Sequence, residues 1–121
     1  MTAVILYIED NPQNMRLVRR MLSGGGYEII DASNGIEGIE VAQRERPDLI
    51  LLDINLPDID GIEVMQTIKA DINLAHIPII ALTANAMYGH REEYLEAGCD
   101  GYLAKPISRR ELLNTVSTFL G

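Results

Sequence analysis

Five side chains with complementary chemistry follow short apolar segments of the chain. Glu9, Asp10 and Asp53 are carboxylates, Thr83 offers a hydroxyl and Lys105 offers an ammonium group. Carboxylates gathered in one place repel each other unless a cation joins them, and Mg2+ prefers such oxygen ligands while keeping water or phosphoryl oxygens in its other positions. An aspartate can itself attack phosphorus and form an acyl phosphate. Together these residues predict a magnesium-assisted phosphoryl-transfer site.

The segments before these residues are predicted strands of a parallel sheet. Leu49–Leu52 is apolar at four successive positions, which suits a strand covered on both faces. In an open parallel sheet, ligands bind beyond the carboxyl ends of the strands, so the reactive side chains are expected at one rim. The other expected strands are Val4–Ile8, Tyr27–Asp31, Ile79–Leu82 and Tyr102–Ala104.

Segments with the apolar spacing of amphipathic helices separate these strands. Asn11 and Pro12 predict an N-cap with proline at the first helical position, and Ser108 with Glu111 predicts a capping box. This alternation predicts an α/β domain with an open, doubly wound parallel sheet, because five strands are too few for a closed barrel. The expected helices run from Pro12 to Leu22, from Gly35 to about Arg44, from Ile62 to Ile72, from about Tyr88 to Ala97, and from Ser108 to Leu120.

Composition limits the classes of protein that fit. The chain has 121 residues and a net charge of -8, from 18 acidic and 10 basic side chains. That length predicts a single domain, residues 1–121, with no output domain. The excess of acid argues against direct nucleic-acid binding, and no apolar run approaches the ~20 residues of a membrane span. One cysteine cannot form an internal disulfide, and no signal peptide is recognisable, so a cytoplasmic location is expected.

Four motifs follow the predicted strands in order. They are Glu9-Asp10-Asn11, Leu52-Asp53-Ile54-Asn55-Leu56-Pro57 followed by Gly61, Leu82-Thr83-Ala84, and Tyr102-Leu103-Ala104-Lys105-Pro106. Together they resemble the motifs of receiver domains of two-component response regulators. The match extends from about Val4 to Leu120, and the chain is similar in particular to DivK-like single-domain regulators and to the receivers of hybrid kinases. The resemblance implies a flavodoxin-like, CheY-like sheet with strand order 2-1-3-4-5.

The resemblance also implies roles for the acidic and amide residues. Asp53 is expected to accept a phosphoryl group from a phosphohistidine on a sensor histidine kinase or a phosphotransfer protein. Glu9 and Asp10 are expected to hold Mg2+ together with Asp53 and the backbone carbonyl of Asn55. Asn55 and Asn85 occupy positions that tune the lifetime of the phosphoryl group in the family.

The remaining implied roles concern binding of the phosphoryl group and the response to it. Thr83 and Lys105 are expected to bind the phosphoryl group on Asp53, and the Lys105–Pro106 peptide bond is expected to be cis. Tyr102 occupies the switch aromatic position, and it is expected to turn into the space that Thr83 vacates.

These roles predict a signalling switch rather than an enzyme that acts on external substrates. Its output is expected to pass to a downstream protein through the face made by the fourth helix, the fifth strand and the fifth helix. The protein is expected to be a monomer, with dimerisation on phosphorylation left open. The alternative is a receiver module cut from a hybrid histidine kinase or a multidomain regulator.

Two more distant alternatives fit the residues less well. A small aspartyl-phosphate phosphatase dependent on Mg2+ would need a second aspartate two residues after Asp53, where Asn55 stands. In a flavodoxin-like electron carrier, Glu9 and Asp10 would repel the flavin phosphate. No metal is assigned to His76 or His90, and the basic helix face of Arg16, Arg19 and Arg20 is interpreted as solvated or as a partner contact.

Overall fold

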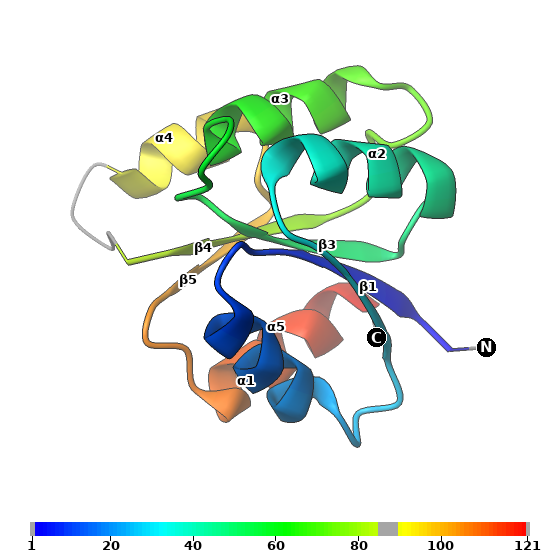
Figure 1. The fold of residues 1–121 in the computed structure, drawn as a ribbon, viewed down its shortest axis with the longest axis vertical. Coiled ribbons are helices and arrows are strands. Elements are labelled where there is room, and N and C mark those ends of the chain that lie inside the picture. The colour runs from blue at the N-terminus through cyan, green and yellow to red at the C-terminus, as the bar shows by residue number, and fades with distance from the viewer. Residues whose placement is uncertain (1, 85–89, 121) are drawn as a thin grey trace.

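Strands and helices alternate along the chain in the computed structural model, which describes residues 2–84 and 90–120, without the side chains of residues 90 and 91. The strands form one parallel sheet in the order β2-β1-β3-β4-β5, which confirms the predicted fold class (Figure 1). The elements are β1 (Val4–Ile8), α1 (Pro12–Leu22), β2 (Glu28–Ala32), α2 (Gly35–Glu45), β3 (Leu49–Asp53), α3 (Gly61–Ala70), β4 (Ile79–Thr83), α4 (His90–Ala97), β5 (Gly101–Ala104) and α5 (Arg109–Leu120).

Helices cover both faces of the sheet, with α1 and α5 on one side and α2, α3 and α4 on the other (Figure 1). Successive side chains of a strand point to opposite faces, so Leu6 and Ile8 of β1 join the core under α2 to α4. Ile5 and Tyr7 join the core under α1 and α5. This double coverage explains why the central strands carry apolar residues at consecutive positions, up to the polar residues at their carboxyl ends, rather than at every second one.

Capping side chains begin the helices where the sequence predicts. Asn11 Oδ1 accepts hydrogen bonds from the backbone N–H groups of Gln13 and Asn14, and Pro12 is the first residue of α1. Ser108 Oγ accepts one from the N–H of Glu111 at 3.1 Å, which begins α5. Both caps lie directly after the ends of β1 and β5, so they fix how the chain turns away from the rim.

The predicted end of the third helix is wrong. We expected this helix to extend to Ile72, but α3 ends at Ala70 and the Ile72 side chain is 89% exposed. Asp71 stops the helix because its side chain accepts a hydrogen bond from the N–H of Asn73, an alternative to helical bonding. Leu74 fills the core in place of Ile72.

The other predicted bounds differ by one or two residues, or they cannot be compared. Strand β2 lies one residue further along than predicted, and α2 ends at Glu45 instead of Arg44. The predicted start of the fourth helix, Tyr88, lies outside the described residues, within which α4 begins at His90. In the part of the chain that the structure describes, no helix has the length and apolar character to cross a membrane.

Candidate functional site

The strand order brings the five predicted residues to one rim of the sheet. Glu9 and Asp10 follow β1, Asp53 is the last residue of β3, Thr83 is the last residue of β4, and Lys105 follows β5. The connections change direction between the neighbouring strands β1 and β3, which is the point where open parallel sheets bind ligands. The rim therefore combines a topological switch point with three carboxylates, a hydroxyl and an ammonium group.

The three carboxylates form one cluster. One oxygen each from Glu9, Asp10 and Asp53 lie within 4.8 Å of one another. Glu9 and Asp53 are 2% and 3% exposed, whereas Asp10 is exposed. Burial, reinforced by the adjacent Asp53 carboxyl, raises the pKa of Glu9 to about 7. The cluster therefore concentrates negative charge where water screens it poorly.

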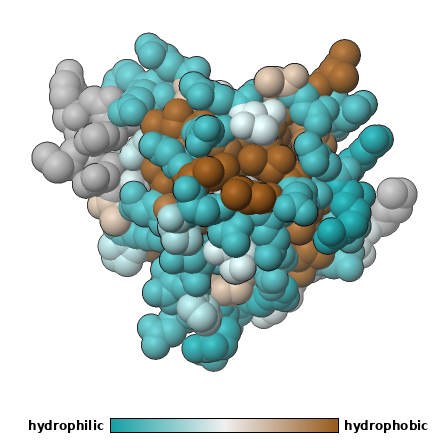
Figure 2. Space-filling view, turned by 45° about the horizontal axis from the view of Figure 1, so that its top comes forward, coloured by the Kyte–Doolittle hydropathy of each residue, from teal (hydrophilic) through white to brown (hydrophobic). Residues whose placement is uncertain are grey.

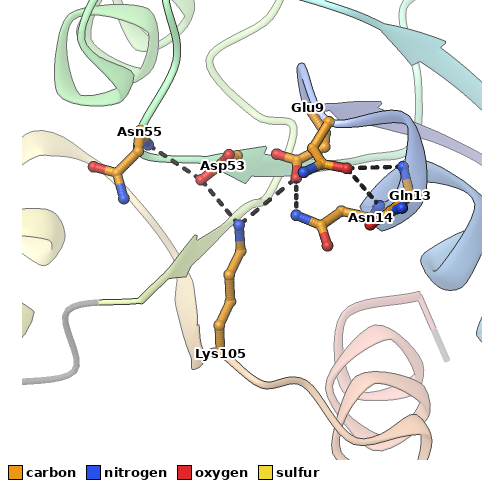
Figure 3. A network of polar contacts seen from close by, with 7 residues as sticks. Glu9, Gln13, Asn14, Asp53, Asn55 and Lys105 are labelled. Atoms are coloured by element: carbon orange, nitrogen blue, oxygen red, sulfur yellow. Dashed lines mark hydrogen bonds and ion pairs between the residues drawn. The ribbon is translucent and has the colours of Figure 1, made fainter.

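Lys105 partly compensates this charge. Its Nζ lies 3.3 Å from Asp53 Oδ1 and 3.7 Å from Glu9 Oε1, so the ammonium group faces both buried carboxylates (Figure 3). The Lys105 backbone N–H donates to the Thr83 carbonyl at 2.8 Å, which fixes the residue beside β4. The peptide bond between Lys105 and Pro106 is cis.

Asn14 is a site residue that the sequence analysis missed. Its Nδ2 donates to Glu9 Oε1 at 2.5 Å, from the first turn of α1 (Figure 3). This bond lowers the pKa of Glu9, in opposition to burial and to Asp53. One sequence feature could have identified Asn14 as a site residue. It stands three residues after the predicted cap Asn11, so it lies at the same end of the helix, close to the rim.

The donor set fits a hard divalent cation. Glu9 Oε2 is buried and has no hydrogen-bond partner among the described residues. Tyr7, on β1 beneath it, has a buried hydroxyl that likewise lacks one there, and burial raises the pKa of this hydroxyl. Leaving a buried carboxylate oxygen unpaired is costly, and a cation held by Glu9, Asp10 and Asp53 would remove that cost. Oxygen donors of this kind match Mg2+.

The loop after β3 holds Asp53 through close backbone contacts. The Asn55 N–H donates to Asp53 Oδ1 at 3.1 Å, and the Gly61 N–H donates to the Ile54 carbonyl at 3.1 Å. A Cβ on Gly61 would lie 2.7 Å from Ile54 Cα, closer than real contacts allow. The glycine of this motif is therefore required for α3 to begin directly against Ile54, the residue that follows Asp53.

Thr83 is completely buried and contacts an aromatic residue of α4. Its Oγ1 lies 3.4 Å from the hydroxyl of Tyr94, whose ring faces that of Tyr102 with centroids 6.1 Å apart. Tyr102 is half-buried on β5. The sequence analysis did not single out Tyr94, because its contact depends on how α4 sits on the sheet. Asn85 lies outside the described residues.

A cavity of about 580 Å³ opens beside the carboxylates. It lies between the loop of residues 54–60 and α4, and Asp10, Asn55 and Tyr94 are among its lining residues. Leu56, Ile59 and Ile62 supply apolar lining. Figure 2 shows the face with α2, α3 and α4, on which apolar side chains gather within a mostly hydrophilic surface. The exposed Asp10 thus connects the carboxylate cluster with this open cavity.

Comparisons with curated proteins identify close relatives. The chain is 44% identical over 117 residues to the polar-differentiation response regulator DivK of Brucella anthropi, covering 97% of this chain and 95% of that protein. It is 43% identical over 121 residues to the DivK of Brucella ovis, covering 100% and 98% of the two chains.

Solved structures show the same fold. The receiver domain of a sensor histidine kinase from Pseudomonas aeruginosa PAO1 is 42% identical, with a TM-score of 0.90 and coverage of 98% of both chains, and that structure holds a magnesium ion in its active site cleft. A chemotaxis response regulator of Vibrio cholerae is 29% identical, with a TM-score of 0.93 and coverage of 99% of this chain and 100% of that one.

The family comparison agrees with the geometry. The model of the response regulator receiver domain matches residues 5–117, a range that includes every residue of the predicted site. Proteins of this kind serve phosphorylation-based signalling, and the carboxylate cluster described above is a candidate metal site. The chain therefore belongs to the family of response regulator receiver domains, as the sequence motifs predict.

Proposed function

We propose that this protein is a phosphorylation-dependent receiver in a two-component phosphorelay, with Asp53 as the phosphoacceptor. The observation that carries the proposal is the position of Asp53: it is buried at the rim, 3.3 Å from the Lys105 ammonium and clustered with Glu9 and Asp10. A carboxylate in this setting can attack a phosphoryl group whose negative charge Lys105 and a bound Mg2+ would neutralise.

In the proposed reaction, one Asp53 carboxylate oxygen forms a bond to phosphorus while the bond from phosphorus to the donor's imidazole nitrogen breaks. The imidazole leaves as a neutral ring after taking up one proton. Lys105 binds a phosphoryl oxygen, and the Thr83 hydroxyl binds another. Mg2+, held by Glu9, Asp10, Asp53 and the carbonyl of Asn55, would neutralise negative charge on the transferred group.

The donor and the target are proposed to be proteins. The phosphoryl group comes from a sensor histidine kinase or a histidine phosphotransfer protein, and the receiver does not act on external substrates. Output passes through the face of α4, β5 and α5, where Tyr102 lies, to a downstream protein. We place the protein in the cytoplasm as a monomer, and its excess of acidic residues supports the proposal that it does not bind nucleic acid.

A second assignment rests on a specific likeness. The 42% identity to the receiver domain of a Pseudomonas aeruginosa sensor histidine kinase supports a receiver module of a hybrid kinase. The chemistry at Asp53 is the same in both assignments, and only the source of the phosphoryl group and the output differ. Transfer from a separate phosphotransfer protein, compared with transfer from a kinase domain in the same chain, distinguishes them.

The test is the intact mass after incubation with acetyl phosphate and Mg2+. We expect one phosphate adduct on the wild type and none on Asp53→Asn. Asp31→Asn is the matched control. Asp31 lies on β2, outside the carboxylate cluster, and pairs with Arg19, so its replacement should leave the adduct unchanged. No adduct on the wild type with acetyl phosphate, a phosphoramidate or a cognate donor, or an adduct that persists in Asp53→Asn, would refute the proposal.

A further inference from the structure

Thr83 is linked to α4 by a contact that lies outside the carboxylate cluster. Its Oγ1 is 3.4 Å from the Tyr94 hydroxyl, within hydrogen-bond distance, and the two side chains are 0% and 4% exposed. Because Thr83 ends β4 and Tyr94 belongs to α4, the contact joins the phosphoryl-binding rim directly to a helix of the proposed output face.

The same tyrosine also packs against the proposed switch residue. The rings of Tyr94 and Tyr102 have centroids 6.1 Å apart and planes tilted by 32°, a common arrangement for interacting aromatic rings. One side chain of α4 is thus in contact with both residues that are proposed to rearrange, Thr83 through its hydroxyl and Tyr102 through its ring.

The Thr83–Tyr94 contact is long enough to be broken by a small movement. Hydroxyl-to-oxygen hydrogen bonds are usually 2.5–3.0 Å long, so 3.4 Å is near the outer limit. A phosphoryl group on Asp53 offers charged oxygens, which accept stronger hydrogen bonds than a neutral phenol oxygen does. Any shift of Thr83 away from Tyr94 toward that group breaks the contact, whichever of the two hydroxyls donates.

We propose that Tyr94 is a positioning residue that holds Thr83 in its unphosphorylated arrangement, and that phosphorylation of Asp53 breaks this bond and releases α4. The inference rests on the proposed function, since it takes Thr83 as a ligand of the phosphoryl group. The Tyr94 hydroxyl then opposes activation, while its ring keeps the packing against Tyr102. The position of Tyr94 in the sequence alone predicts neither the role of its hydroxyl nor that of its ring.

The test uses beryllofluoride as the phosphoryl mimic. Tyr94→Phe removes the hydroxyl and keeps the ring, so the buried packing is retained. Wild type and variant are titrated with beryllofluoride at saturating Mg2+, and binding is followed through the amide NMR signals of β4 and α4. We expect the apparent affinity of Tyr94→Phe to be higher by roughly two- to tenfold, the range of one net hydrogen bond. Tyr27→Phe, which removes a hydroxyl before β2, should match the wild type.

A double-mutant cycle separates a direct bond from a general packing effect. Thr83→Ala removes this contact of the Tyr94 hydroxyl, so Tyr94→Phe should have a smaller effect on the affinity in that background than in the wild type. An equal effect in both backgrounds, or an affinity of Tyr94→Phe that is unchanged or lower than that of the wild type, overturns the inference.

A measurement on the unmutated protein removes any dependence on the folding of the variants. With tyrosine labelled by 13C at Cζ, the Tyr94 resonance reports the hydrogen bonding of its hydroxyl. It should shift when wild-type protein is saturated with beryllofluoride, and a resonance that does not move overturns the inference. If the wild type binds no beryllofluoride, the proposed function fails; if it binds and Tyr94 does not respond, only this inference fails.

Discussion

The site has two halves that hold their polar groups differently. In the carboxylate half, formed by Glu9, Asp10, Asp53, Asn14 and Lys105, Asn14 donates to Glu9 at 2.5 Å and Lys105 lies 3.3 Å from Asp53. The hydroxyl half is formed by Thr83, Tyr94 and Tyr102. The polar contact between Thr83 and Tyr94 is 3.4 Å long, and the Tyr94 and Tyr102 rings pack against each other with tilted planes. Every polar contact of the first half involves a charged group, whereas the contacts of the second half join neutral groups.

This difference indicates that one half binds the phosphoryl group and the other half responds to it. Buried charges that lose a partner are strongly penalised, so the charged groups of the carboxylate half are expected to stay paired whether or not a phosphoryl group is present. A neutral hydroxyl that exchanges one partner for another loses little free energy, so the hydroxyl half can rearrange. The carboxylate half should therefore determine whether the phosphoryl group binds, and the hydroxyl half should determine what the protein does next.

Lys105→Met gives the largest expected effect. It removes the ammonium group that lies beside Asp53 and Glu9, and hydrogen bonds to charged groups are worth about 1.5–3 kcal/mol. We expect the affinity for beryllofluoride at saturating Mg2+ to fall by roughly ten- to a hundredfold, measured by NMR titration. Lys69→Met is the control, since Lys69 pairs with Asp100 at the opposite end of β4; a similar loss in both variants would contradict the assignment.

Gly61→Ala tests the support of Asp53 in the same half. The added Cβ would lie 2.7 Å from Ile54 Cα, so the loop after β3 must shift, and we expect a loss of about 1–3 kcal/mol in the free energy of unfolding. Urea titration measures the loss. The amide signals of Asp53 and Asn55 should move in Gly61→Ala but stay in place in Gly24→Ala, a substitution that its positive φ of 88° also strains but that lies in the loop between α1 and β2.

Asn14→Ala tests the orientation of Glu9. Without the amide donor at 2.5 Å, the Glu9 carboxylate loses the bond that fixes one of its oxygens, and we expect Mg2+ affinity to fall about tenfold. Isothermal titration with Mg2+ measures it. Gln13→Ala, one position away on the exposed side of α1, should bind Mg2+ like the wild type; an unchanged affinity in Asn14→Ala would show that Glu9 needs no such support.

Tyr102→Phe gives the smallest expected effect, and it belongs to the hydroxyl half. The aromatic ring that packs against Tyr94 is retained, so we expect the affinity for beryllofluoride to change by less than about twofold. The same NMR titration measures it. A tenfold loss would show that this half helps to bind the phosphoryl group, and the contrast between the two halves would then fail.

In each half, some site residues could be predicted from the sequence and others could not. Asp53, Thr83 and Lys105 could be identified because parallel strands end at one rim, so apolar runs followed by polar residues mark the site. The position of Asn14 near the rim followed from the predicted helix start, but its bond to Glu9 did not. The role of Tyr94 depends on how α4 is placed against the rim, which spacing along the chain does not specify. The prediction of the end of α3 was wrong for a similar reason, since the hydrogen bond to the Asp71 side chain overrides the apolar pattern that continues to Ile72.

The most direct test of the account is to locate the phosphoryl group chemically. Protein phosphorylated with acetyl phosphate and Mg2+ is treated with borohydride, which reduces an aspartyl phosphate to homoserine, and the digested peptides are sequenced by mass spectrometry. We predict homoserine at position 53, and none when Mg2+ is removed with a chelator before phosphorylation. Homoserine at another aspartate with position 53 intact, or equal labelling without Mg2+, would contradict the central claim that Asp53 accepts the phosphoryl group in a magnesium-dependent site.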